Sequence, residues 1–196
     1  MEINRLDVYP HNFSEKIGYS EVRHLLEEYC ASSLGREEMQ ALEASADKED
    51  IVRALDETRE MITIMAGESP LPSLALVDCR DVLRRIRPQG TFIEEEELLD
   101  LLRMLETLHS LQHFFLEEHT TGERAAETFA YTYPRLASLL EDTPSFPKIE
   151  THLRSLLTEE GKLRDNASRD LLRIRQTIRE TERSLSGMLQ RILSTA

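Results

Sequence analysis

Apolar residues recur at alternating steps of three and four along most of this chain, and this spacing constrains the fold more than any other feature. It places apolar side chains on one face of an α-helix. The pattern predicts helices over residues 20–30, 37–42, 48–65, 78–87, 91–119, 135–140, 146–157 and 168–196. Most of the glycines and prolines lie in the breaks between these segments. The sequence therefore predicts an all-α fold.

The last of these helices has the most regular pattern. Its apolar positions form a seam of about three heptads: Leu171, Ile174, Ile178, Leu185, Met188 and Ile192, with Thr181 at the remaining step. Ser168 is the predicted N-cap. Because the seam is narrow, we expect this helix to pack on one partner helix. The fold class is therefore an elongated helical bundle with a long C-terminal helix, and that helix is expected to be cut in mid-pattern at Ala196, at the boundary of a fragment.

The net charge of −13 is unevenly distributed along the chain. Residues 161–196 contain eight Lys or Arg and four Asp or Glu, which gives this segment a charge of +4 and leaves −17 for the rest. An acidic surface repels phosphates, so the chain as a whole is not expected to bind nucleic acid. We expect two regions: an acidic helical core over residues 1–160, and the start of a long basic helix over residues 161–196.

Basic residues on the last helix are the only candidate recognition feature. They are Arg169, Arg173, Arg175, Arg179 and Arg183. Three of them follow one another at four-residue steps, which forms a cationic ridge on one face of the helix. Two interpretations remain open: a solvated or internally ion-paired helix face, or a surface that contacts nucleic acid or an acidic protein partner.

An acidic run precedes the apolar pattern of residues 91–119. Thr91 and Glu94 have the spacing of a capping box, and Glu94–Glu97 lie near the positive end of the helix dipole. With Asp100, these carboxylates resemble half of a magnesium-binding helix pair. The matching acidic helix is missing, and capping already explains the run, so no magnesium site is expected.

Two histidines on the same predicted helix could bind zinc. His109 and His113 lie four residues apart, with Glu106 and Glu117 one turn to either side. No further Cys or His cluster completes a site, so no metal site is expected.

Motifs of known enzyme classes are missing from the sequence. It contains no G-x-x-x-x-G-K-[ST] phosphate loop, no G-x-S-x-G elbow, no H-E-x-x-H and no paired C-x-x-C. Cys30 lies on an apolar stripe, where we expect a buried, inert thiol. We expect no catalytic residue and no cofactor in this chain.

The compartment is predicted from what the sequence lacks. No apolar run approaches the roughly 20 residues of a membrane span, and Met1–Arg5 does not begin a signal peptide. The two cysteines belong to no pairing motif. We therefore expect a cytoplasmic protein with no membrane contact.

Several short motifs resemble the N-terminal part of the MutS family, specifically the second bacterial subfamily, which lacks the mismatch-recognition domain. These motifs lie at Phe13–Tyr19, Cys30–Glu37, Arg85–Phe92 and Glu95–Leu101, and the most specific one is Gly161–Ser168, followed by Leu171–Arg175. Arg169 departs from the family, which usually has proline there. The resemblance extends over nearly the whole chain.

The resemblance implies that the chain is the first half of the core and lever region. It implies a larger parent protein with clamp and ATPase domains, in which ATP and Mg²⁺ bind downstream, and with a C-terminal nuclease-like domain. Such parents are associated with DNA repair and recombination control, with DNA or ribosome (rRNA) binding and with homodimers. The expected role is a non-catalytic segment that couples the ATPase state to nucleic-acid clamping. The alternative is a stand-alone helical module that binds through the arginine ridge.

Overall fold

Helices make up nearly all of the ordered secondary structure, as predicted. The computed structural model describes residues 12–67, 71–116, 118–119, 127–128 and 132–195. The helices in these ranges are α1 (Phe13–Lys16), α2 (Tyr19–Glu28), α3 (Ser33–Ala41), α4 (Lys48–Ala66), α5 (Arg80–Arg85), α6 (Glu95–Leu116), α8 (Pro134–Glu141), α9 (Pro147–Leu156) and α10 (Arg169–Thr195). Two short strands, β1 (Glu118–His119) and β2 (Glu127–Thr128), pair antiparallel. The all-α class is confirmed.

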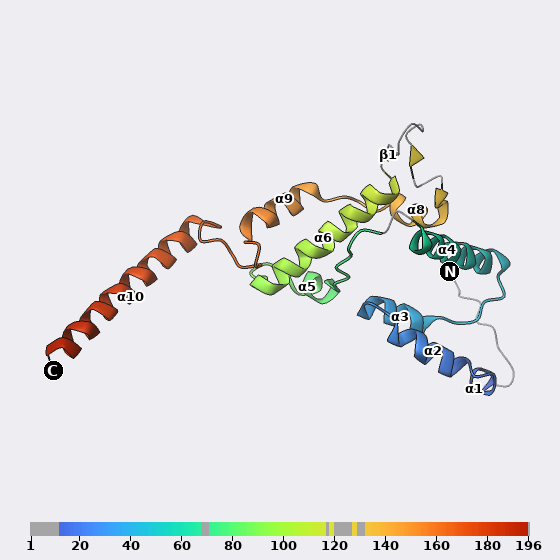
Figure 1. The fold of residues 1–196 in the computed structure, drawn as a ribbon, viewed down its shortest axis with the longest axis horizontal. Helices are drawn as coiled ribbons and strands as arrows, with labels where there is room; N and C mark the ends of the chain where they lie inside the picture. Colours follow the sequence, from blue (N-terminus) through green and yellow to red (C-terminus); the bar gives the residue numbers. More distant parts are fainter. Residues whose placement is uncertain (1–11, 68–70, 117, 120–126, 129–131, 196) are drawn as a thin grey trace.

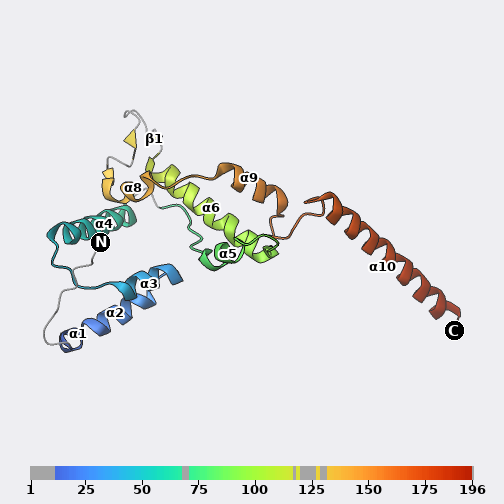
Figure 2. The same cartoon turned by 180° about the vertical axis from the view of Figure 1, so that it is seen from behind.

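The molecule is elongated, with α6 at its centre (Figure 1). Helices α8 and α9 pack on α6, and α4 packs on α8. Helices α1 to α3 form a separate hairpin-like unit at one end, and α10 extends away from the other end, as the reverse view also shows (Figure 2). The predicted boundary at residue 160 lies in the turn between α9 and α10; the division into two domains stays a prediction.

Helix α6 carries two separate hydrophobic clusters. Near its C-terminal end, Phe114 and Phe115 pack with residues of α4 and α8: Ile64, Leu136 and Ala137. Nearer its N-terminal end, Leu102 and Leu105 pack with Leu153 and Leu157. Burial of these side chains is the main force that holds α4, α8 and α9 to α6.

A carboxylate from α4 caps the N-terminus of α8. Glu60 accepts hydrogen bonds from the backbone N–H groups of Arg135 and Leu136, at 3.1 and 2.9 Å. Pro134 occupies the first turn of α8, where its missing N–H costs nothing. The carboxylate satisfies two of the free N–H groups at the helix start, so it fixes α8 against α4.

The start of α6 differs from the prediction. Helix α6 begins at Glu95, not at Thr91, because the Thr91 hydroxyl donates to the carbonyl of Pro88 (2.8 Å) instead of capping a helix. The capping role passes to Glu97, whose carboxylate accepts from the N–H of Glu94 (3.0 Å). At α10, the predicted cap is confirmed: Ser168 accepts from the N–H of Leu171 at 3.1 Å.

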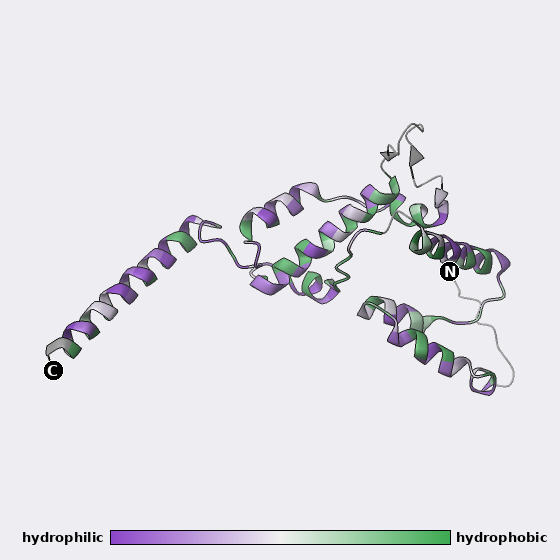
Figure 3. Ribbon diagram, in the orientation of Figure 1, coloured by the Kyte–Doolittle hydropathy of each residue, from purple (hydrophilic) through white to green (hydrophobic). Residues whose placement is uncertain are grey.

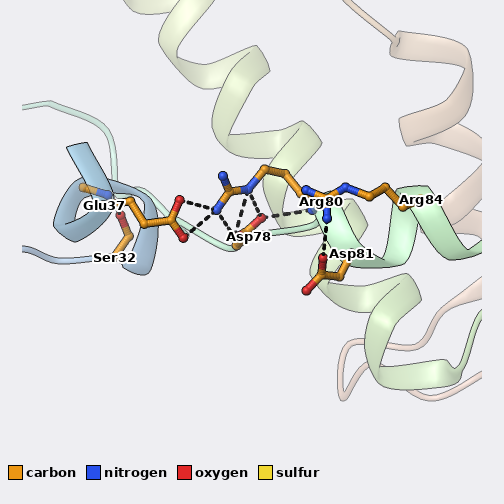
Figure 4. Close-up of polar contacts among 7 residues, drawn as sticks. Ser32, Glu37, Asp78, Arg80, Asp81 and Arg84 are labelled. Atoms are coloured by element: carbon orange, nitrogen blue, oxygen red, sulfur yellow. Dashed lines mark hydrogen bonds and ion pairs between the residues drawn. The ribbon is translucent and has the colours of Figure 1, made fainter. Parts of the chain in front are cut away.

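An ionic network connects α3 to the N-terminal end of α5 (Figure 4). Arg80 donates to both carboxylate oxygens of Glu37, at 2.7 and 2.8 Å, and to Asp78. The hydrogen bonds from Arg80 lower the pKa of Asp78 to about 2. Helices α2 and α3 contain no buried residue, so this network is a defined polar link between the N-terminal unit and the rest of the chain.

The two cysteines differ in burial. Cys79 is buried, and burial raises the pKa of its thiol. Cys30, which was expected to be buried, is only half-buried. The reason is that Cys30 lies beyond the end of α2, at Glu28, and so outside the helical stripe.

Candidate functional site at the base of the terminal helix

A tight turn connects α9 to α10. Leu157 and Leu163 form an antiparallel bridge, and Thr158 donates its N–H to the carbonyl of Lys162 at 2.8 Å. The N–H of Arg164 reaches the carbonyl of Leu156, also at 2.8 Å. These bonds make residues 156–164 a closed loop with a defined geometry.

Gly161 brings this turn into contact with α6. Its φ of +77° is in the left-handed region, which glycine adopts without strain. A Cβ atom at this position would lie 2.4 Å from Cδ2 of Leu99. A side chain at position 161 would therefore force Leu99 to move, so the turn lies close against α6.

Glu95, the first residue of α6, holds the same turn by a polar contact. Its carboxylate accepts a short hydrogen bond from the N–H of Leu163, and Nζ of Lys162 lies 3.6 Å from its Oε2. The hydrogen bond from Leu163, aided by the charge of Lys162, lowers the pKa of Glu95 below its ordinary value. This carboxylate is therefore ionised throughout the physiological pH range.

Asp165 fastens α10 to the turn. Its Oδ1 accepts from Nη1 of Arg175 at 2.6 Å, and its Oδ2 accepts from Arg179. Nη1 of Arg175 also donates to the carbonyl of Leu163 at 3.0 Å. Leu163 thus accepts a hydrogen bond from Arg175 through its carbonyl and donates one to Glu95 through its N–H. These bonds connect the base of α10, the turn and α6 in one junction.

The structure divides the five predicted arginines among different environments. Arg175 and Arg179 bind Asp165, and Arg173 lies 3.4 Å from Asp170, with both side chains exposed. Arg169 and Arg183 are exposed, and among the described residues neither makes an ion pair. The five side chains do not converge on one point. Nucleic-acid or partner contact by these arginines stays a prediction.

Sequence reasoning did not predict the residues that form this junction. It assigned no role there to Asp165, which binds two of the arginines, or to Glu95 and Leu99, which contact the turn. The available signal was the motif Gly161–Ser168, which places a left-handed glycine and a carboxylate just before the helix start. The α6 residues that contact the turn, Leu99 at Gly161 and Glu95 at Leu163, lie more than 60 residues away in sequence.

A polar pocket with a volume of about 550 Å³ lies beside α6 and α9. Arg154 donates to Glu106 and to Glu150, each at 2.7 Å, and Nδ1 of His109 lies 3.2 Å from Glu150. These contacts pair Glu106 and His109, two of the four zinc ligands considered above, with other side chains. Glu117 lies outside the described residues. Within the part of the chain that the structure describes, no group of three or more His, Cys, Asp or Glu side chains is placed to hold a metal ion.

Within the described ranges, no helix is both long enough and apolar enough to cross a bilayer.

Comparison with known proteins identifies homologues of nearly the whole chain. A protein named endonuclease MutS2 from Streptococcus suis is 31% identical over 184 residues. Proteins of the same name from Alkaliphilus oremlandii and Finegoldia magna are 28% and 25% identical over 178 and 177 residues. The chain is homologous to a segment of MutS2 proteins. No family model and no solved structure matches it.

The alignments with MutS2 proteins cover 90–92% of this chain but only 21–22% of each relative. The chain thus spans about a fifth of the length of the MutS2 proteins that it matches. The resemblance to the MutS family is supported at the level of a fragment, and a non-catalytic segment fits this coverage. The position of the segment within the core and lever region is part of the proposal below.

The lowered pKa of Glu95 predicts how the junction responds to acid. A carboxyl group whose folded-state pKa is depressed stabilises the fold above its unfolded pKa, near 4.5, and loses this contribution as the pH falls through the folded value. We expect the amide resonance of Leu163 to stay constant as the pH falls from 7 toward the ordinary glutamate pKa of 4.5, and to shift only at lower pH, through the depressed pKa of Glu95. A two-dimensional NMR titration measures this shift, with Glu95→Gln as the non-titrating control. A midpoint at or above 4.5 would contradict the assignment.

Proposed function

We propose that this chain is a non-catalytic structural segment, the beginning of the core and lever region, of a cytoplasmic MutS-type DNA-binding ATPase. The observation that carries the proposal is the junction at the base of α10. A long helix projects from a helical body and is fastened to it by Asp165, Glu95 and the close approach of Gly161 to α6. The MutS2 names of the relatives support the choice of protein class.

A fastened helix of this length suits mechanical transmission. The 27 residues of α10 span about 40 Å at 1.5 Å per residue. The hydrogen bonds within a helix make it stiff, so a rotation at the base moves the far end. Transmission also requires an element with two states. In the proposal, nucleotide binding in a downstream ATPase domain, with ATP and Mg²⁺, switches the body, and α10 carries the change toward a clamp around nucleic acid.

The proposal includes the wider setting of the parent protein. We infer that the remainder of the parent chain, with its clamp, ATPase and nuclease-like domains, is the immediate partner of this segment. DNA or the ribosome would be the substrate of the parent, with roles in DNA repair, in recombination control or in ribosome quality control, and the parent would act as a homodimer. None of these activities requires a catalytic residue in the segment itself.

The test is made in the full-length protein. Ile178→Pro breaks α10 near its middle, at a local cost of about 3 kcal/mol, and should uncouple ATP turnover from nucleic-acid binding while each activity alone persists. Ile178→Ala, which keeps the helix, is the matched control and should remain coupled. Asp165→Asn loosens the base without breaking the helix and should give an intermediate loss of coupling. Full coupling in Ile178→Pro would refute the mechanical role.

The exposed arginines favour a second candidate function. Three arginines of α10 have exposed, positively charged side chains: Arg169, Arg173 and Arg183. Exposed positive charge suits a stand-alone module that binds nucleic acid or an acidic partner. In that case the chain alone should bind double-stranded DNA at low salt. Each of the three arginines replaced by Gln should reduce the slope of log K against log salt by about one. Absence of binding at low salt would dismiss this candidate.

A further inference from the structure

Helix α4 is covered on one face and uncovered on the other. On the covered face, Ile64 is buried against α8 and Glu60 caps the N-terminus of that helix. The opposite face carries a stripe whose apolar residues are between 40 and 61% exposed: Ile51, Leu55 and Ile62, with Thr58 at the remaining step. A continuous apolar stripe in water is unfavourable, so a second surface is expected to cover it.

Helix α2 carries a second uncovered stripe. Its apolar residues, with Tyr29 just beyond the helix end, are between 45 and 86% exposed: Val22, Leu25, Leu26 and Tyr29. Helices α2 and α3 pack on each other, but among the described elements neither packs extensively on α4, α6, α8 or α9. Figure 3 shows hydrophobic positions between hydrophilic ones along both α2 and α4. The chain therefore contains two apolar stripes that lack a partner surface among the described helices.

The connections of the chain set the relative direction of these two helices. Four residues separate α2 from α3, and six separate α3 from α4. Short connections favour antiparallel neighbours, so α2 and α4, on either side of α3, run in the same direction; in Figure 1 both run from right to left. Six extended residues reach about 20 Å, which is enough for the pair of α2 and α3 to swing onto α4.

The two stripes match in a parallel orientation. Both have a step of three residues followed by a step of four, so their side chains can be aligned layer by layer. The layers are Val22 with Leu55, Leu25 with Thr58, and Tyr29 with Ile62. The same register places Glu21 beside Arg59, at flanking positions where opposite charges favour the pairing. Arg59 uses Nη1 to bind Asp56, and its guanidinium has further N–H donors for a second carboxylate.

A single arginine ties the pair of α2 and α3 to another part of the molecule. Nη2 of Arg80, at the start of α5, donates to both carboxylate oxygens of Glu37 on α3 (Figure 4). The two side chains are 47 and 56% exposed, and exposed ion pairs contribute little to stability. The tie is therefore weak enough to open without unfolding the rest of the protein.

We propose that α2 and α3 form a movable arm, which the pair of Arg80 and Glu37 latches in an open position. When the latch opens, the arm closes on α4, and the stripes of α2 and α4 form the core of a three-helix bundle with α3. Closure is a contact within this chain and goes beyond the proposed function. It requires no ATP, nucleic acid or downstream domain.

Closure is tested by disulfide trapping in the 196-residue chain. Leu25→Cys with Thr58→Cys, in a Cys30→Ser background, places two thiols in one layer of the closed bundle, close enough for a disulfide. We expect an intramolecular cross-link on mild oxidation, seen as a faster band in non-reducing electrophoresis. The control pairs Leu25→Cys with Arg53→Cys, which is exposed on the other side of α4, and should not cross-link. No cross-link in the first pair, or equal cross-linking in both, would overturn the proposal.

The role of the latch is tested in the same cross-linking variant. Arg80→Gln and Glu37→Gln each release the arm and should raise the cross-linking rate by up to about fivefold, the contribution of an exposed ion pair. Arg84→Gln is the control, because Arg84 pairs with Asp81 on its own helix, and should leave the rate unchanged. An unchanged or lower rate in Arg80→Gln would contradict the latch. The coupling measured with Ile178→Pro does not depend on the arm, so the two proposals fail independently.

Discussion

Replacing Gly161 by alanine should destabilise the junction by about 2–4 kcal/mol. About 1–2 kcal/mol of this comes from forcing an alanine into the left-handed region, since φ is +77°. The remainder comes from overpacking, because the new methyl group would lie 2.4 Å from Cδ2 of Leu99. Urea denaturation measures the loss of stability, and hydrogen exchange at Leu163 locates it.

Gly90 supplies the matched control for this prediction. Its φ is +88°, but no atom lies within 4 Å of the position where a Cβ would be placed. Gly90→Ala should therefore show the backbone cost alone, about 1–2 kcal/mol. The double variant Gly161→Ala/Leu99→Ala should recover part of the difference. Equal losses for Gly161→Ala and Gly90→Ala would show that the turn does not lie against α6.

Replacing Phe115 by alanine should destabilise the protein by about 3–5 kcal/mol. This side chain is 3% exposed in the cluster that joins α6 to α4 and α8. Its ring meets that of Phe114 edge to face, with centroids 4.9 Å apart, and such pairs add to the value of burial. Urea denaturation gives the total effect.

Because α6 carries two separate hydrophobic clusters, the loss of stability in Phe115→Ala should be confined to the elements that pack on the Phe115 cluster. Hydrogen-exchange protection should fall in α4 and α8 more than in α9, because α9 packs on the other cluster. Phe92→Ala is the control: its ring is 70% exposed, and the change should stay within about 0.5 kcal/mol. A uniform loss of protection along α6 would show that the two clusters unfold as one unit.

Local patterns were sufficient to predict most of the helices. Helix α4 (Lys48–Ala66) begins after Asp47, whose carboxylate caps the N–H groups of Glu49 and Asp50, and the predicted range 48–65 agrees with it. Both the periodicity and the cap are contacts between near neighbours, so a sequence displays them directly. The predicted α10, with Ser168 as its cap, was correct for the same reason.

The start of α6 shows where local patterns fail. Thr91 and Glu94 have the spacing of a capping box, but a second set with the same spacing, Glu94 and Glu97, forms the actual helix start. Arg85 decides between the two: it forms an ion pair with Glu97 and donates to the carbonyl of Phe92 at 3.1 Å. The sequence contains two overlapping capping-box spacings, and only the contacts of Arg85 in the folded chain show which of them starts the helix.

Residue type and spacing were sufficient to predict an all-α chain, an acidic body, a basic terminal helix and an apolar seam along that helix. Tertiary structure alone decided how the arginines are used. Their four-residue spacing places them on one helix face, yet Arg175 and Arg179 bind Asp165 across a turn, and Glu95 holds that turn from 68 residues away. Charge and periodicity are properties of a local segment, whereas the partner of a charge depends on which distant groups the folded chain brings within hydrogen-bonding distance.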